Sequence, residues 1–269
     1  MLSRFQRPIA LVLLAVLSVG GVRTIQINNS QDIALRSLNV DPAHPGPRRI
    51  GELIFTGAWE LQSLNEDFGG ISGLTLLPDG RFIGISDAGT LIGFGLSNNE
   101  QTDRPFIAPL PGAVGPNINY KDRDSEGVTY DPQSGQFWVS YEANHAIRRF
   151  SRSFARMTGV VRPPEMQDWP INRGAEALIR LRDGRFMTIA ESVDDGTHPA
   201  LLFSGDPVEK GSVTSRFTYR PPSGYRVTDG VQLPDGRLAI LHRSIGLPKG
   251  FAAKVGVLAL SDIGKGKTV

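Results

Sequence analysis

The chain contains no cysteine and only four histidines. The absence of cysteine excludes disulfide bonds and a lipid-modified cysteine, so the folded domain must be stabilised by packing alone. Because zinc and copper sites rely on thiolates and imidazoles, a site for either metal is poorly supported by this composition.

The chain also has little excess charge of either sign. Its formal net charge is +2, from 29 basic and 27 acidic residues. The first 24 residues hold Arg4, Arg7 and Arg23 and no acid, and setting them aside leaves 26 basic against 27 acidic residues. The remaining charge of −1 gives no warrant for a nucleic-acid partner or for binding to an anionic membrane.

Long hydrophobic runs are scarce. The apolar run at residues 9–17 is too short to cross a bilayer comfortably, and it lies between two arginines and a stretch of small residues. This order is typical of a secretory signal. We therefore expect a signal peptide at residues 1–24, with an uncleaved N-terminal anchor as the alternative, an N-terminal extension at residues 25–49, and a periplasmic or secreted protein. We expect no other contact with a membrane.

Helix-period stretches of useful length are missing as well. Instead, 31 glycines and 19 prolines fall mostly between short apolar runs, a pattern that predicts many short strands. The sequence therefore predicts an all-β fold, with enough apolar residues for one core in residues 50–269.

One sequence pattern occurs four times. Each copy has an apolar strand, a turn and a second apolar strand, which together predict a β-hairpin. The copies occupy residues 69–87, 124–142, 173–191 and 228–243, and their equivalent positions are Ser72, Glu126, Glu176 and Asp229. These positions are 54, 50 and 53 residues apart. A period near 50 residues is typical of the blades of a β-propeller.

Two strands do not fill a propeller blade, so we expect further strands between the hairpins. The apolar runs that supply them are residues 90–96, 146–150, 200–203 and 255–260. A strand at residues 51–61 could complete the outer edge of another blade. At about 52 residues per repeat, residues 50–269 give a count near the low end of the range for propellers, so we expect four-stranded blades in a ring that is incomplete at its C-terminal end.

Acidic residues recur at the strand ends that a propeller brings together at one mouth of its central channel. Six of them are candidate metal ligands: Asp87, Glu126, Glu142, Glu176, Glu191 and Asp229. Clustered carboxylates raise one another's pKa values, and a divalent cation would relieve this repulsion. Oxygen-only ligands favour calcium. The alternative is that these acids cap strand ends and accept backbone hydrogen bonds.

Arginines flank the same positions. Arg173 precedes the third acidic strand start and Arg243 ends the fourth hairpin. Guanidinium groups bind phosphate or carboxylate oxygens in pairs, and a metal ion can activate a water or polarise the group under attack. We therefore expect a small-molecule anionic ester as substrate. The candidate catalytic residues are Glu126, Glu176, Asp229, Arg173 and Arg243.

Ser72 lies in a short glycine-rich segment but does not fit a nucleophile elbow. That motif needs a following helix and a partner histidine, and the sequence indicates neither. Ser72 is better interpreted as the first-repeat counterpart of the acids.

The repeat segments carry a family resemblance. The segments are FGGISGL (68–74), SDAG (86–89), DSEGV (124–128), WVSYE (138–142) with Asn144, and NRGAEAL (172–178). In their order and phase the sequence resembles the phytase-like family described as having esterase-like activity of phytase. The resemblance implies an exported, hydrolase-like propeller related to calcium-dependent phytases. It also implies a further blade after residue 260, which this sequence does not contain.

Three functions remain open at this point. The first is a calcium-dependent hydrolase acting on a phosphoester or another ester at the channel mouth. The second is a non-catalytic propeller that binds a ligand or partner at the same place, since a fold alone does not imply an activity. The third is a lactonase-like calcium propeller, which would share the acidic channel.

Overall fold

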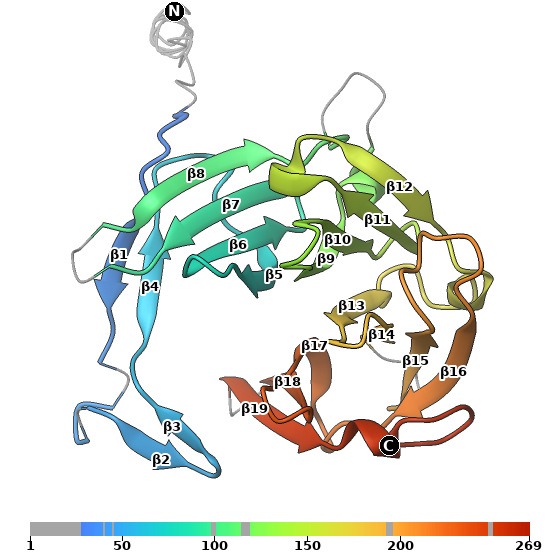
Figure 1. Cartoon of the computed structure of the whole chain (residues 1–269). Helices are drawn as coiled ribbons and strands as arrows, with labels where there is room; N and C mark the ends of the chain where they lie inside the picture. The colour runs from blue at the N-terminus through green and yellow to red at the C-terminus, as the bar shows by residue number, and fades with distance from the viewer. Residues whose placement is uncertain are drawn as a thin grey trace, which may run out of the picture.

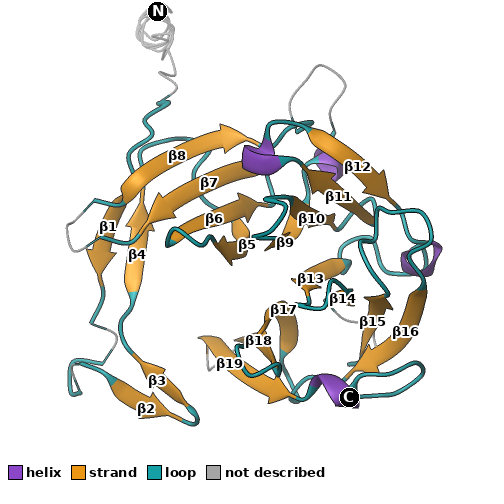
Figure 2. Cartoon of the chain, viewed as in Figure 1, coloured by secondary structure: helices purple, strands orange, loops and turns teal. Residues whose placement is uncertain are grey.

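The computed structural model describes residues 28–39, 41–44, 46–97, 101–113, 119–191, 196–246 and 250–269. The expected signal peptide at residues 1–24 lies outside the described residues. The described part is all-β and forms a four-bladed propeller, in which small antiparallel sheets are arranged around a central axis (Figures 1 and 2). The predicted fold class is confirmed.

Each repeat builds one blade, and we number the blades in chain order. Blade 1 contains β5 (Ile71–Leu76), β6 (Arg81–Ser86), β7 (Thr90–Gly95) and β8 (Asp103–Pro109). Blade 2 contains β9 (Ser125–Tyr130), β10 (Phe137–Tyr141), β11 (Ala146–Phe150) and β12 (Met157–Val161). Blade 3 contains β13 (Ala175–Arg180), β14 (Phe186–Ala190), β15 (His198–Phe203) and β16 (Thr214–Tyr219). Blade 4 contains β17 (Arg226–Gln232), β18 (Leu238–Gly246) and β19 (Gly250–Leu258), so within the described residues it has three strands.

The helical content is small. The described residues contain four 3-10 helices outside the strands: η1 (Tyr120–Asp122), η2 (Arg152–Phe154), η3 (Pro164–Met166) and η4 (Leu260–Asp262). In the part of the chain that the structure describes, no helix combines the length and the hydropathy needed to cross a bilayer.

The innermost strands of neighbouring blades approach one another closely, and glycine makes this approach feasible. A Cβ atom added to Gly73 would lie 2.5 Å from the Glu126 carbonyl oxygen, and one added to Gly127 would lie 2.8 Å from the Glu176 carbonyl oxygen. The Ser140 hydroxyl, on β10 of blade 2, donates to the Ala175 carbonyl of blade 3 at 2.8 Å. The glycines that follow Ser72 and Glu126 therefore allow neighbouring blades to pack closely.

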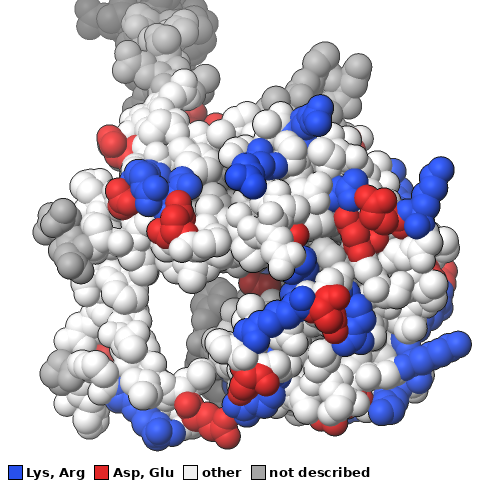
Figure 3. All heavy atoms as spheres, in the orientation of Figure 1, with Lys and Arg blue, Asp and Glu red and all other residues white. Residues whose placement is uncertain are grey.

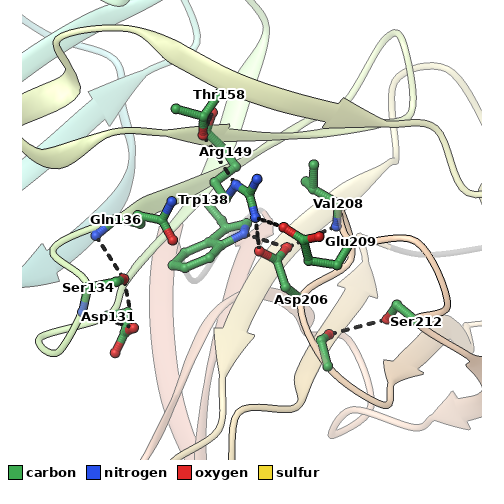
Figure 4. Close-up of polar contacts among 11 residues, drawn as sticks. Asp131, Ser134, Gln136, Trp138, Arg149, Thr158, Asp206, Val208, Glu209 and Ser212 are labelled. Carbon is green, nitrogen blue, oxygen red and sulfur yellow. Dashed lines mark hydrogen bonds and ion pairs between the residues drawn. The ribbon is translucent and has the colours of Figure 1, made fainter.

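A polar network joins blades 2 and 3 farther from the axis (Figure 4). The Trp138 indole donates to Asp206 at 2.8 Å, and Arg149 forms ion pairs with Asp206 at 2.6 Å and with Glu209. The Trp138 ring also packs on Phe186 of blade 3, with centroids 4.9 Å apart. These contacts fix the relative position of the two blades that carry most of the acidic cluster described below.

The N-terminal strands lie in the arc between blade 4 and blade 1 (Figure 1). Here β1 (Ala34–Ser37) pairs with β4 (Trp59–Gln62), and β2 (Arg48–Ile50) pairs with β3 (Leu53–Phe55). Glu52, in the β2–β3 turn, forms an ion pair with Arg237 of blade 4 at 3.5 Å. The expectation that residues 51–61 form the outer strand of a blade was wrong. This segment is split between β3, which pairs with β2, and β4, which pairs with β1, and both two-stranded sheets are separate from the blades.

The C-terminal residues form backbone hydrogen bonds with blade 3. The Arg220 amide donates to the Val269 carbonyl at 2.7 Å, and the Val269 amide donates to the Thr218 carbonyl at 2.9 Å. This pairing runs along the outer strand β16. It links the last residues of the chain to the blade before the final one.

Acidic and basic side chains are interspersed on the visible face of the molecule (Figure 3). In the Asp-Gly-Arg turns of the molecule, the arginine forms an ion pair with the aspartate two residues before it. The pairs are Arg81 with Asp79 at 2.9 Å, Arg185 with Asp183 at 2.7 Å and Arg237 with Asp235 at 2.7 Å. The turn arginines are thus engaged locally.

Candidate functional site

The strand register determines which residues of the four blades are equivalent. Near its start, the innermost strand of each blade has a one-residue shift in its pairing with the second strand. The last residues paired before the shift are Ile71, Ser125, Ala175 and Val227, so the residues that follow them are Ser72, Glu126, Glu176 and Thr228. Bulges of this kind redirect a side chain at a strand end, and here they lie at one mouth of the channel.

Asp229 is therefore not the fourth-blade counterpart of Glu176, contrary to our prediction. It pairs with Leu241, one residue beyond the shift, and a slip of one residue turns a side chain to the other face of a strand. Asp229 lines a separate cavity of about 400 Å³ with apolar side chains such as Leu74 and Val128. Burial there raises the pKa of Asp229 to about 7, and its carboxylate accepts a hydrogen bond from the Gly230 amide at 2.7 Å.

The sequence contains a signal that would have avoided this error. In the first and third repeats this position lies six residues before the first residue of the turn, as Ser72 precedes Pro78 and Glu176 precedes Arg182. Counting back six residues from Pro234 gives Thr228. Asp229 instead resembles Ser72 and Glu126 only in preceding a glycine.

Four of the six predicted acids meet at the channel mouth, and Asp124 joins them. Two overlapping triads are formed, Asp124–Glu126–Glu142 and Glu142–Glu176–Glu191. Within each triad, one oxygen from each residue lies within 4.8 Å of the others. Glu142 belongs to both triads, so the five carboxyl groups form one continuous cluster across blades 2 and 3. We call this set of five residues the acidic cluster.

Backbone hydrogen bonds place these carboxylates in the same way in successive blades. In each case an acidic residue follows the second strand of a blade, and its backbone amide donates to a backbone carbonyl. That carbonyl belongs to the residue just before the first strand of the same blade. The three cases are Asp87 to Gly70 at 3.2 Å, Glu142 to Asp124 at 2.9 Å and Glu191 to Gly174 at 2.9 Å. The Glu142 side chain also accepts a hydrogen bond from the Gly174 amide at 3.0 Å. A Cβ atom on Gly174 would lie only 2.9 Å from Glu142, which explains the glycine before this strand.

Burial makes the negative charge of the cluster costly. It raises the pKa of Glu126 to about 8, of Glu142 to about 7 and of Glu176 to about 9, and neighbouring carboxylates add to each shift. Burial also raises the pKa of Asp124. Such a cluster must bind protons, cationic side chains or a metal ion near neutral pH.

Asp87 lies beside the cluster without joining either triad. Its charge contributes to the raised pKa values of Asp124 and Glu126. A Cβ atom on Gly70 would lie 2.5 Å from the Asp87 carboxylate, so the small residue at position 70 leaves room for this side chain. The Ser72 hydroxyl forms a hydrogen bond with Glu126, which lowers the pKa of that carboxyl.

Two predicted arginines lie at the edge of the cluster. Arg243 approaches Glu191 at 3.1 Å and Glu176 at 3.9 Å. Arg173 and Arg243 both line a cavity next to Glu191. Arg226, which the sequence analysis did not select, forms an ion pair with Glu191 at 3.2 Å.

Sequence comparison among the repeats could not identify Asp124 or Arg226. Asp124 and Arg226 occupy the same position in blades 2 and 4, and the equivalent residues in blades 1 and 3 are Gly70 and Gly174. No charge therefore recurs at this position from blade to blade. These two side chains become recognisable only when the blades meet.

The donor set fits a hard cation. All five ligand candidates offer carboxylate oxygens, which calcium accepts in flexible geometry. Arg226 and Arg243 partly neutralise the Glu176–Glu191 side. Among the described residues, Asp124, Glu126 and Glu142 have no lysine or arginine within ion-pair distance, so this triad is the better place for a cation.

The family model named Phytase-like, esterase-like activity of phytase, matches residues 66–269. The chain belongs to this family. The match covers all four blades and every residue of the acidic cluster. No curated protein matches the chain.

Solved structures resemble this phytase-like protein only at low identity and low TM-score. The U3-55K structure has a TM-score of 0.38 and 10% identity, and the alignment covers 71% of this chain and 54% of that one. The structure of hydrazine synthase of Kuenenia stuttgartiensis has a TM-score of 0.41 and 12% identity, and the alignment covers 70% of this chain and 50% of that one. The chain thus spans about half the length of these two proteins. The structure of the GH43 β-1,3-galactosidase with galactodeoxynojirimycin has a TM-score of 0.43 and 12% identity, and the alignment covers 72% of this chain and 74% of that one.

Proposed function

We propose that this phytase-like protein is an exported hydrolase that binds a divalent cation, calcium by its donor set, and cleaves a phosphoester or another ester at the channel mouth. The observation that carries the proposal is the acidic cluster, whose two triads share Glu142. Its buried carboxyl groups have raised pKa values, a feature common at catalytic and metal sites. The family match supports a hydrolase of this kind.

We assign the cation to Asp124, Glu126 and Glu142, because this triad has no arginine partner. When bound, such an ion polarises the ester centre or activates a water molecule. Arg243 lies where it can stabilise negative charge that develops on the substrate. Glu176 lies between this triad and Arg243 and can move a proton to or from the reacting group.

The competing function is a ligand-binding propeller without turnover, and a lactonase-like activity is a third candidate. Both would use the same cluster, so substrate tests must separate them. The acidic cluster supports cation binding in all three cases.

The first experiment is calcium titration calorimetry on the purified protein, followed by hydrolysis assays with phytate, p-nitrophenyl phosphate, p-nitrophenyl butyrate and a simple lactone, each with and without chelator. We expect calcium binding and chelator-sensitive cleavage of at least one ester. Binding without cleavage of any substrate would favour the ligand-binding propeller. Cleavage of the lactone alone would favour the third candidate.

The variant Glu142→Gln tests the site within this experiment. Glutamine keeps an oxygen that can accept the Gly174 hydrogen bond, so the fold should persist while both triads lose a charge. We expect at least a tenfold loss in calcium affinity and in ester cleavage. Glu66→Gln is the matched control, because Glu66 is exposed and lies outside the cluster. Equal calcium affinities of Glu142→Gln and Glu66→Gln would contradict the assignment of the cation to the acidic cluster.

Export is part of the proposal and rests on residues 1–24 of the sequence. Cell fractionation combined with N-terminal sequencing tests it. A mature N-terminus near residue 25 in the periplasm or medium is the expected result, and an intact N-terminus in the cytoplasm would contradict export.

A further inference from the structure

Asp229 occupies a strand position that takes a small residue in the other three blades. The residue that follows the shifted one is Gly73 in blade 1, Gly127 in blade 2, Ala177 in blade 3 and Asp229 in blade 4. A Cβ atom on Gly73 or Gly127 would lie 2.5 or 2.8 Å from a backbone carbonyl of the next blade, and Ala177 is fully buried. At this position a side chain therefore points toward the next blade.

In the part of the chain that the structure describes, no further blade follows blade 4. The Asp229 side chain consequently has room at this position and stays partly exposed. It lines the apolar cavity of about 400 Å³ introduced above, a volume within the range of pockets for small ligands.

The cavity lies near the propeller axis, because all four innermost strands contribute to its wall. Val128 and Leu178 in this wall lie two residues after Glu126 and Glu176, on the same strands. None of the five residues of the acidic cluster lines the cavity. The cavity is therefore a second site, next to the acidic cluster along the axis but distinct from it.

The wall of the cavity presents apolar surface to solvent. Five of its large hydrophobic side chains are exposed: Leu74, Leu76, Val231, Leu241 and Val255. Exposed apolar side chains that gather at one place mark a binding site, whereas single ones are ordinary. An apolar ligand would remove this surface from water, which favours binding.

The cavity also holds one carboxylate without a cationic partner. Arg180, the other charged residue in the wall, is neutralised by Asp131 at 2.9 Å. Asp229 accepts a hydrogen bond from the Gly230 amide at 2.7 Å, and no cation among the described residues contributes to its pKa. A carboxylate in apolar surroundings is destabilised unless it is paired. A cation with an apolar body would pair with the carboxylate and cover the wall together.

We propose that this cavity binds a small organic ammonium ion, whose charged nitrogen pairs with Asp229 and whose apolar body packs on Leu74 of blade 1 and Leu241 of blade 4. An ammonium group donates charge-assisted hydrogen bonds to a carboxylate. An anion would be repelled by Asp229, and a neutral ligand would leave it unpaired. The inference does not rest on the proposed hydrolase function, since it involves neither a metal ion nor a reaction.

Titration calorimetry of the full chain in excess EDTA tests the inference, at pH 8 so that Asp229 is mostly ionised. The probes phenethylamine, phenethyl alcohol and phenylacetate have similar apolar bodies and a positive, neutral or negative head group. Methylamine carries the ammonium group without the apolar body. We expect phenethylamine to bind about tenfold or more tightly than each of the other three, because only it supplies both interactions.

Asp229→Asn is the decisive variant. The asparagine oxygen can still accept the Gly230 hydrogen bond, so the fold should persist while the charge is lost. We expect phenethylamine to bind about 10- to 100-fold more weakly, as for loss of a hydrogen bond to a charged group. Asp262→Asn is the matched control, because Asp262 is exposed and does not line the cavity.

A second variant tests the apolar wall. Val231 is exposed, so Val231→Ser should leave the fold intact while it removes apolar surface from the cavity. We expect phenethylamine to bind about threefold or more weakly, as for loss of a buried methyl group.

Equal affinities for phenethylamine in Asp229→Asn, Asp262→Asn and the unmodified protein would overturn the inference, and so would failure of phenethylamine to bind. Loss of binding in Glu142→Gln but not in Asp229→Asn would place the amine at the acidic cluster and would also overturn it. Binding that depends on Asp229 in a protein without calcium binding or ester cleavage would uphold the inference while the proposed function fails.

Discussion

At the scale of single residues, the acidic cluster depends on a register shift of one position. Asp124 enters the cluster although the repeat pattern did not mark it, and Asp229 lies in the apolar cavity although the pattern did. Asp229 was misplaced because a shift of one residue moves a carboxylate to the other face of a strand, whereas Asp124 was missed because the equivalent residues of blades 1 and 3 are glycines. Side-chain chemistry alone could not separate the two aspartates.

A pair of neutral substitutions tests this assignment. Asp124→Asn removes a charge from the triad that we assign to calcium, so we expect the calcium dissociation constant to rise at least tenfold. Asp229→Asn replaces a carboxyl group outside the cluster and should change calcium affinity by less than twofold. Calorimetry on both variants measures the difference, and the opposite ranking would restore Asp229 to the site.

At the scale of elements, close packing of the innermost strands positions the carboxylates. β5, β9, β13 and β17 contact their neighbours in sequence order. At Gly73 and Gly127 the backbone of the next blade occupies the space that a side chain would need. The glycines of the repeat are therefore required by packing between blades, beyond any role in a turn.

The substitution Gly73→Ala tests this packing role. Its methyl group would meet the Glu126 carbonyl oxygen at 2.5 Å, so a strand must move, at a cost of about 1–3 kcal/mol in the free energy of unfolding. Gly205→Ala is the control, because a Cβ atom there meets nothing within 4 Å and the backbone is not left-handed. Denaturant unfolding measures both. Equal stabilities of the two variants would exclude a packing role for Gly73.

At the scale of the whole molecule, the buried cluster couples stability to pH and to cation binding. In the metal-free protein the pKa values of Glu126, Glu142 and Glu176 are raised to about 8, 7 and 9, from 4.5 for an unperturbed glutamate. Between about pH 4.5 and pH 9 the folded state therefore binds more protons than the unfolded state. The contribution of these three carboxyl groups to the free energy of unfolding therefore falls as pH rises through this window.

Thermal unfolding between pH 7 and pH 9, above the lowered pKa values of His145, His198 and His242, checks this coupling. In EDTA we expect Tm to fall as pH rises, because deprotonation leaves uncompensated buried charge. In calcium the fall should be smaller, since a bound cation replaces the protons, and Tm should depend on calcium concentration. A Tm in EDTA that is constant or rises across this range would contradict the raised pKa values.

The amino-acid sequence is enough to predict the all-β class, the four hairpin repeats and the residue types of the channel mouth. These features are local: alternating apolar strands and Asp-Gly turns leave the same mark in every copy. Only the tertiary structure decided that Asp124 and Arg226 join the site, that Asp229 does not, and that residues 51–61 lie outside the blades. Those outcomes depend on strand register and on contacts between segments far apart in the chain. These contacts are stabilised by packing between blades, so they cannot be predicted from the residues of a single repeat.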